Sequence, residues 1–271
     1  MIRSICISII ITLLLSCVKK QTNLVIIGTV HEPAKNFNPD SLYNILVQVK
    51  PDVILYELDS TFFDSDFNFT KELFSNEFIA TTRYTKNHNT IVRPYDFTGR
   101  NQHRINIGSR PTDGKVHELL DSLYLNGFLV ENHHRIMSRY KKINKTLISK
   151  AYGKALDFNN AETDSISQLH QDIQYKKINV VVKAIPLFSE KFQVLPYGDS
   201  ITFAEGYQRA ENFWHLRNKT MAANIQKFIQ AYEGKTIVVL NGFFHRYYLN
   251  KELRPYQDSM GFRIYEFYNF K

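Results

Sequence analysis

The stretch LVIIGTVHEPAKNF at residues 24–37 starts with apolar residues and turns at Gly28, three residues before His31. A short β-branched run that ends at a glycine is typical of a buried strand. The same arrangement returns in TIVVLNGFFHRYYL at 236–249, where Gly242 precedes His245. The sequence therefore predicts two buried strands from distant parts of the chain, each running into a Gly-x-x-His turn.

The segments around these strands favour an α/β fold. A helix with apolar residues at helical spacing is expected over 38–50, between the first strand and a second buried strand at 52–59. A strand, a helix and a strand in this order indicate a parallel sheet. The same reasoning predicts further elements, namely a strand at 89–97, a long helix at 204–232, a short helix at 245–253 and a last strand at 261–268. We expect a mostly parallel central sheet flanked by helices.

The middle of the chain, about residues 100–200, has a different pattern. Two helices are expected within 115–150, whereas residues 179–197 fit a helix or a strand and are broken by Pro186 and Pro196. Because no repeat or low-complexity linker separates this part, it is interpreted as a helical insertion. Residues 24–271 are thus expected to form one domain.

The N-terminus resembles a bacterial lipoprotein leader. MIRSICISIIITLLLSC combines a basic start with an apolar run too short for a membrane span and a Leu-Leu-Ser-Cys ending. Residues 1–16 are therefore predicted to be a signal peptide, Cys17 the lipidated residue and 17–23 a tether; an uncut signal anchor is the alternative. Val18 and Lys19 provide no acidic retention signal, which favours an exported protein anchored to an outer membrane or cell surface.

Cysteine content and charge exclude some functions. Both cysteines, Cys6 and Cys17, lie in the leader, so the domain has no thiol nucleophile and no cysteine ligand for a metal. The formal charge is +8, and removing the leader with Arg3 leaves +7. The basic residues are scattered, and an exported chain rarely meets nucleic acid, so no nucleic-acid partner is expected. The membrane, reached through the lipid anchor, is the expected partner.

Four polar side chains follow the ends of predicted strands: His31, Glu57, Asp96 and His245. In an open α/β sheet, ligands bind beyond the carboxyl ends of the strands. A carboxylate at the end of a buried run is costly unless it is paired, bound to a metal or functional. Each residue alone has an ordinary structural explanation, but all four fall at the same sheet edge, which predicts a site there.

The long helix brings two more candidates, Arg217 and Asn218. Asn218 shares a helical stripe with apolar residues, which suggests a polar group directed at something buried. The simplest structural role for Glu57 is an ion pair with Arg93 or Arg217. The sequence does not distinguish a structural role for Glu57, with either arginine as its partner, from a functional one.

With these residues assembled, the chain resembles the superfamily of TraB/PrgY and TIKI proteins, distantly related to erythromycin esterases and ChaN. The resemblance rests on four segments in the family's order, IIGTVHEP at 26–33, KPDVILYELD at 50–59, RNKTMAAN at 217–224 and VVLNGFFH at 238–245. It implies that His31 and His245 bind a divalent metal, that Glu57 is the acidic site residue and that Arg217 is the helix arginine. Asn218 in place of Asp, and Gly-Thr-Val-His in place of Gly-Glu-x-x-His, favour the TraB/TIKI branch over the esterases.

The chemistry of these groups supports several hypotheses. Two imidazoles and a carboxylate could hold Zn²⁺, Mn²⁺ or Co²⁺ with a reactive water, while Arg217 binds an oxyanion or a substrate carboxylate. The first hypothesis is thus a metal-dependent hydrolase of peptides or small-molecule esters, with catalytic residues Glu57, Arg217 and Asn218 and a further acid at Asp96. A variant needs no metal, because His31 oriented by Glu57 could activate water. A surface protein that binds a peptide signal or a haem-like ligand, and a scaffold with a decayed site, are the alternatives.

Overall fold

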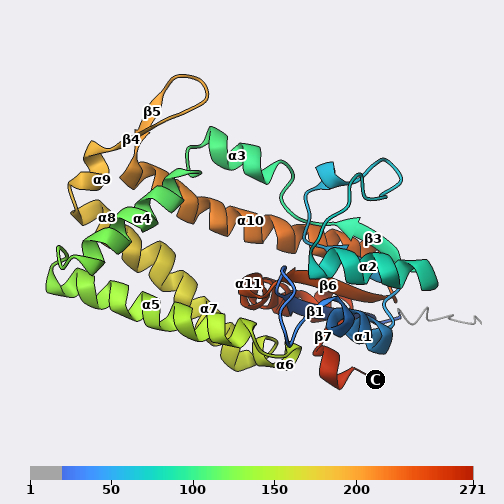
Figure 1. Cartoon of the computed structure of the whole chain (residues 1–271). Coiled ribbons are helices and arrows are strands. Elements are labelled where there is room, and N and C mark those ends of the chain that lie inside the picture. Colours follow the sequence, from blue (N-terminus) through green and yellow to red (C-terminus); the bar gives the residue numbers. More distant parts are fainter. Residues whose placement is uncertain (1–19, 271) are drawn as a thin grey trace, which may run out of the picture.

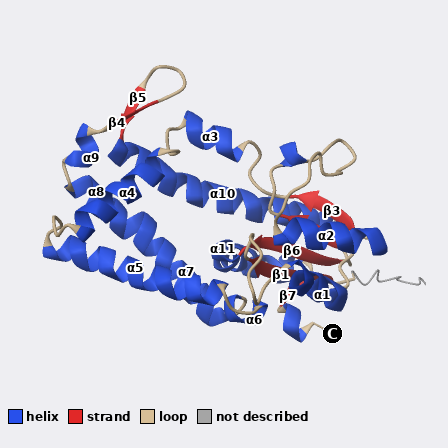
Figure 2. Ribbon diagram, viewed as in Figure 1, coloured by secondary structure: helices blue, strands red, loops and turns tan. Residues whose placement is uncertain are grey.

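The computed structural model describes residues 20–270 and has the expected α/β architecture, with a five-stranded parallel sheet in the order β3-β2-β6-β1-β7 (Figures 1 and 2). The strands are β1 Thr22–Thr29, β2 Val53–Tyr56, β3 Ile91–Pro94, β6 Thr236–Gly242 and β7 Phe262–Tyr265. The helices that accompany the sheet are α1 Pro39–Val49, α2 Asn76–Asn87, α10 Phe203–Ala231, α11 Phe243–Leu253 and α12 Gln257–Met260. The predicted fold class is confirmed.

β6 lies between β1 and β2 and pairs with both in parallel, so the two strands of the first strand-helix-strand unit are not neighbours. Its register sets Thr29 opposite Gly242 and Tyr56 opposite Leu240. The last part of the chain is thereby inserted into the centre of the sheet. This pairing brings the ends of β1, β2 and β6 together.

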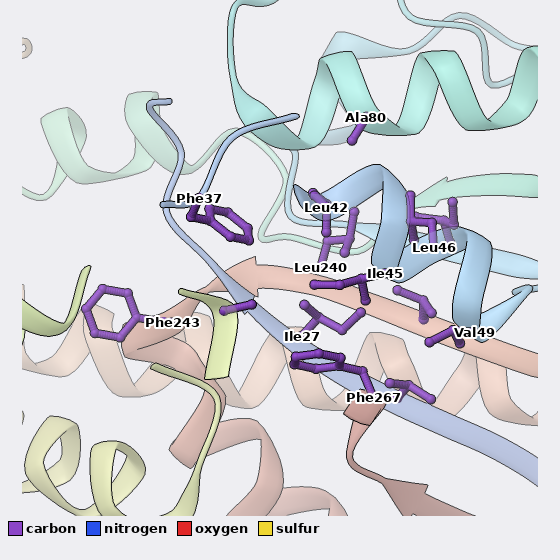
Figure 3. Packing of buried hydrophobic residues seen from close by; sticks show 14 of the residues in the cluster. Ile27, Phe37, Leu42, Ile45, Leu46, Val49, Ala80, Leu240, Phe243 and Phe267 are labelled. Atoms are coloured by element: carbon purple, nitrogen blue, oxygen red, sulfur yellow. The ribbon is translucent and has the colours of Figure 1, made fainter. Parts of the chain in front are cut away.

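Alternating side chains of the strands build a core on each face of the sheet. Val25 and Ile27 of β1 pack with α1 on one face, as Figure 3 shows for Ile27 and α1 residues such as Leu46. Leu24 and Ile26 pack on the other face with α10 and α11. The near-continuous apolar sequence of these strands follows from this two-sided burial.

The middle of the chain forms the expected helical insertion. It contains α3 Arg100–Asn106, α4 Thr112–Leu125, α5 Glu131–Ala151, α6 Ala155–Phe158, α7 Ala161–Gln171, a π-helix Asp172–Lys177, α8 Ile178–Ala184, α9 Leu187–Glu190 and a hairpin of β4 Phe192–Val194 and β5 Ser200–Thr202. The ambiguous stretch 179–197 therefore becomes helix, short helix and strand in turn. The insertion has its own apolar core from α4, α5, α8, α9 and α10.

α10 connects the two parts. Its capping box of Thr202 and Glu205 fixes its start. Its first turns pack in the insertion core through Phe203 and Tyr207, and its later turns pack on the sheet through Met221 and Ile225. With 29 residues at 1.5 Å rise, this helix is about 43 Å long, so it holds the insertion at a fixed place beside the sheet (Figure 1).

Some predicted boundaries were wrong. β1 begins at Thr22, inside the segment expected to be a tether, and β3 and β7 are shorter than the strands expected at 89–97 and 261–268. Helix α2 was not predicted. Within residues 20–270 no helix is long and apolar enough to cross a membrane. The predicted signal peptide and the lipidation residue Cys17 lie outside the described residues.

Candidate functional site

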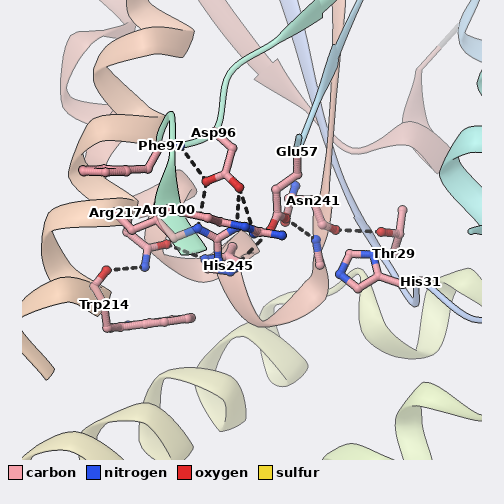
Figure 4. Close-up of polar contacts among 12 residues, drawn as sticks. Thr29, His31, Glu57, Asp96, Phe97, Arg100, Trp214, Arg217, Asn241 and His245 are labelled. Carbon is pink, nitrogen blue, oxygen red and sulfur yellow. Dashed lines mark hydrogen bonds and ion pairs between the residues drawn. The ribbon is translucent and has the colours of Figure 1, made fainter. Parts of the chain in front are cut away.

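The carboxyl edge of the sheet gathers all four polar residues predicted there. His31 follows β1, Glu57 follows β2, Asp96 follows β3, and His245 lies in the first turn of α11 after β6 (Figure 4). Because β6 lies between β1 and β2, residues from four separated segments meet at one edge. The structure therefore places these residues together, at the location that the sequence predicts.

The two turn glycines are required by close packing. A Cβ on Gly28 would lie 2.9 Å from both Cα and Cβ of Phe243, and a Cβ on Gly242 would lie 3.2 Å from Nε2 of His31. Asn159 of the insertion fixes the first turn, because Gly28 N donates to its Oδ1 (2.6 Å) and its Nδ2 donates to Gly28 O (2.9 Å). Small residues at these two positions thus let the strand ends and the insertion approach one another.

Glu57 is buried and both its carboxylate oxygens accept hydrogen bonds. Oε1 accepts from Nη2 of Arg217 at 2.5 Å and Oε2 from the backbone N of Gly242 at 2.6 Å. Burial alone would raise the pKa of Glu57, but the positive charges of Arg217 and His31, with the hydrogen bond from Gly242, hold it below its ordinary value. Glu57 is therefore a permanent anion and a poor proton acceptor near neutral pH. Of the two structural partners considered for Glu57, Arg217 is the one observed.

Arg217 and Asp96 form the centre of a charge network. Nε and Nη2 of Arg217 donate to the two carboxylate oxygens of Asp96 at 2.7 and 2.8 Å, the bidentate geometry favoured by guanidinium groups. Arg100 of α3 donates to Asp96 at 2.8 Å and lies 3.9 Å from Glu57. Two guanidinium groups thus neutralise two buried carboxylates.

His245 is held as a neutral ring. Nη1 of Arg217 can only donate, so Nε2 of His245, 2.9 Å away, is the acceptor. Nδ1 then carries the proton and donates to Oδ1 of Asn218 at 2.7 Å, while Nδ2 of Asn218 donates to the carbonyl of Trp214. Burial lowers the pKa of His245 to about 3, and the ring stacks on Trp214 with centroids 4.5 Å apart. The buried target expected for Asn218 is this imidazole.

His31 belongs to a second pair that the sequence did not predict. Its Nδ1 lies 2.8 Å from Oε1 of Glu77 at the start of α2, and the hydroxyl of Thr29 donates to the same oxygen. The hydrogen bond to Glu77, with the negative charge of that carboxylate, outweighs desolvation and raises the pKa of His31 to about 9. The side chain remains 60% exposed, and its Nε2 is turned towards Gly242. Glu77, rather than the expected Glu57, orients His31.

Two cavities adjoin the network. One of about 290 Å³ is lined by His31, Glu57, Arg100 and apolar side chains of Leu58, Leu73, Phe74 and Leu240. The other, of about 280 Å³, lies against Arg217 and Trp214 and is also lined by Tyr175 of the π-helix. Tyr175 stacks on Trp214. His31 and Arg100 both line the first cavity, and the side chains of both are partly exposed to solvent.

The donor set does not fit the metal site that the resemblance implies. The lone pair of His245 Nε2 faces a guanidinium nitrogen, and Glu57 Oε1 accepts from the same arginine. Across residues 20–270, no three His, Cys, Asp or Glu side chains are grouped so that they could hold a metal ion. A metal between His31, His245 and Glu57 would require Arg217 to release His245 and Glu57.

Sequence reasoning missed Glu77, Arg100, Asn159 and the stacking role of Trp214. The one sequence signal near Glu77 is Ser75, a residue type that commonly caps a helix start and here caps α2. Arg100 and Asn159 come from segments with no apolar pattern that would place them at the sheet. Their positions depend on the path of the insertion.

Comparisons of the chain with protein-family models, with curated proteins and with solved structures find no match. The resemblance to the TraB/TIKI superfamily therefore stays a prediction based on the four motifs.

Proposed function

We propose that the chain is a hydrolase of ester or peptide bonds in which His31 activates water without a metal ion. The observation that carries this proposal is the His31–Glu77 pair, in which Nδ1 is held by a carboxylate while the imidazole lines a cavity of about 290 Å³. An imidazole whose other nitrogen is held by a carboxylate is a common general base.

In the proposed reaction, Nε2 of His31 takes a proton from water as the water oxygen attacks the carbonyl carbon. Glu77 stabilises the imidazolium ion that forms, and Arg100 supplies positive charge for the developing oxyanion. Collapse of the intermediate breaks the bond to the leaving group, which receives the proton from His31. Glu57, Arg217, Asp96, Asn218 and His245 act as positioning residues that hold Arg100 and the turn after β6.

The pKa of His31 determines how this site responds to pH. With a pKa of about 9, the ring is mainly protonated at pH 7, so the base form is the minor one. Hydrolysis should therefore increase as the pH rises towards 9. The apolar part of the cavity favours an apolar acyl group on the substrate.

The test is hydrolysis of p-nitrophenyl esters and of a peptide library by the purified full-length chain. His31→Gln should reduce kcat/KM by about 10²-fold or more, as expected when a general base is removed. His134→Gln, an exposed histidine on α5, is the matched control and should leave the rate unchanged. A His31→Gln variant that hydrolyses every active substrate at the wild-type rate would refute the proposal.

One observation favours a second candidate function, the binding of an anionic ligand without turnover. A protonated His31 and Arg100 line the same cavity at neutral pH, and they could hold the carboxylate of a peptide signal or of a haem-like molecule. Calorimetric titration with peptides and with haem would show stoichiometric binding that weakens above pH 9. Cleavage of any bound peptide would favour the hydrolase over a protein that only binds its ligand.

The leader sequence supports the further proposal that the chain is exported and anchored through acylated Cys17. Labelling with a radioactive fatty acid in a bacterial host should mark the wild type, whereas Cys17→Ser should abolish the label. Labelling that persists in Cys17→Ser would reject this anchor.

A further inference from the structure

The end of α4 and its connection to α5 carry a group of exposed apolar side chains, which we call the apolar tip: Leu125, Phe128 and Val130. Their exposed fractions are 76%, 75% and 63%, and they fall within six residues of one another. The connection lies at the end of the molecule away from the sheet (Figure 1). Leu129, between them, is buried and fixes the connection to the insertion core. The tip is therefore a supported projection from the domain.

The helix that begins at the tip is strongly basic on its solvent side. α5 carries six lysines and arginines and one acidic residue, Glu131. Four of the basic residues are exposed and recur at helical spacing, so they form a basic stripe of Arg135, Arg139, Lys142 and Lys145. Two nearby acids pair with lysines outside the stripe, Asp121 with Lys141 and Asp172 with Lys176, and Glu131 is the one acidic residue on the same helix. The stripe thus keeps its positive charge.

A groove continues this surface between α5 and the helices α7 and α8. It has a volume of about 570 Å³, its apolar lining includes Ile136 and Ile173, and its charged lining residues are Arg139, Lys177 and Asp172. Val180 is itself largely exposed. Arg139 belongs both to the basic stripe and to the groove, so apolar and cationic groups occur together next to the stripe.

We propose that the apolar tip and the basic stripe dock the domain on an anionic membrane surface. Large apolar side chains at a projecting turn, beside lysines and arginines, match the layered chemistry of a bilayer interface, where acyl chains lie beneath anionic headgroups. A second copy of the chain fits less well, because a twofold contact would bring two basic stripes together. A nucleic acid would use the stripe and leave the tip exposed to water.

The docking contact is separate from the predicted lipid anchor. β1 starts at the sheet end of the molecule, whereas the tip lies at the opposite end (Figure 1). The experiment must therefore report on the tip itself and not on membrane attachment in general.

The test places a fluorescent reporter in the tip of the full-length chain. Phe128→Trp is mixed with vesicles of phosphatidylcholine alone or with equimolar phosphatidylglycerol, each with brominated acyl chains. The response is measured as the difference from the wild type, which contains a single tryptophan, Trp214. The emission of the introduced indole should shift to shorter wavelength and be quenched with the anionic vesicles. Phe74→Trp, at an exposed phenylalanine beside the sheet, is the matched control and should stay unquenched.

A charge variant tests the stripe. Lys142→Glu with Lys145→Glu, in the Phe128→Trp background, should weaken the quenching response at least about tenfold in lipid concentration, because each basic residue contributes attraction to an anionic surface. Reversal of two exposed lysines elsewhere, Lys219→Glu with Lys251→Glu, should have a smaller effect. Added salt should also weaken the response.

Three results would overturn the proposal. The first is sedimentation of the Phe128→Trp protein with vesicles while the introduced indole stays unquenched. The second is equal quenching by neutral vesicles and by anionic ones. The third is a dimer, seen by analytical ultracentrifugation, that Phe128→Ser dissociates, since the tip would then be a contact between copies.

Discussion

Nη1 of Arg217 lies 2.9 Å from Nε2 of His245 and occupies the lone pair that a metal ion or a substrate proton would need. The two residues come from α10 and α11, and Asn218, the neighbour of Arg217, binds the other nitrogen of the same ring. One turn of helix α10 therefore fixes both nitrogens of His245. Arg217 and Asn218 of α10 therefore act together to hold the ring of His245 on α11 in one orientation.

The first prediction concerns metal dependence. Because His245 and Glu57 both accept from Arg217, incubation with a chelator should leave hydrolysis by the full-length chain unchanged. The metal content measured by mass spectrometry should also be equal in the wild type and in His245→Ala. Activity that is lost on chelation and restored by Zn²⁺ would instead support the two-histidine metal site.

The second prediction concerns the pH profile. The wild-type kcat/KM should rise with pH up to about 9 and then level off, because only the neutral form of His31 accepts a proton. Glu77→Gln removes the partner that raises the pKa of His31, so the midpoint should move down towards the ordinary value of about 6.5. Glu72→Gln changes an exposed acid in the preceding loop and should leave the midpoint in place. Equal midpoints in Glu77→Gln and the wild type would show that His31 does not set the profile.

The third prediction concerns the stability of the charge network. Glu57→Gln should lower the free energy of unfolding by about 3 kcal/mol, because its amide nitrogen must face either Arg217 or the Gly242 N–H, both of which donate. Asp40→Asn, which breaks an exposed pair with Arg83, should cost less than about 1 kcal/mol. Urea denaturation measures both changes. Equal losses would mean that Glu57 is not paired in the buried network.

The fourth prediction concerns the first turn. Gly28→Ala should lower the free energy of unfolding by about 1–3 kcal/mol, because the added Cβ meets the backbone and side chain of Phe243. Gly114→Ala in α4 has open space around its Cβ and should raise that free energy by about 0.5–1 kcal/mol. Thermal unfolding monitored by circular dichroism should show a lower Tm for Gly28→Ala and a higher Tm for Gly114→Ala than for the wild type. A stabilising Gly28→Ala would contradict the close approach of β1 and α11.

Part of the site could be predicted because strand ends are visible in sequence. The apolar runs before Gly28, Glu57 and Gly242 mark buried strands, and parallel strands place their carboxyl ends on one edge. Glu77 was missed because α2 has a weak apolar pattern. Arg100 was missed because α3 has no buried residue that would indicate its position.

The amino-acid sequence alone determined the α/β class, the parallel sheet, the long helix α10 and the common edge of His31, Glu57, Asp96 and His245. These follow from local apolar patterns, which register burial along a single segment. Only the tertiary structure decided that β6 enters between β1 and β2, that Arg217 takes the lone pair of His245 and that Glu77 holds His31. These hydrogen-bond partners depend on how distant segments pack against one another. The apolar pattern of a single segment indicates which of its faces is buried, but not which side chain of another segment will lie within hydrogen-bond distance.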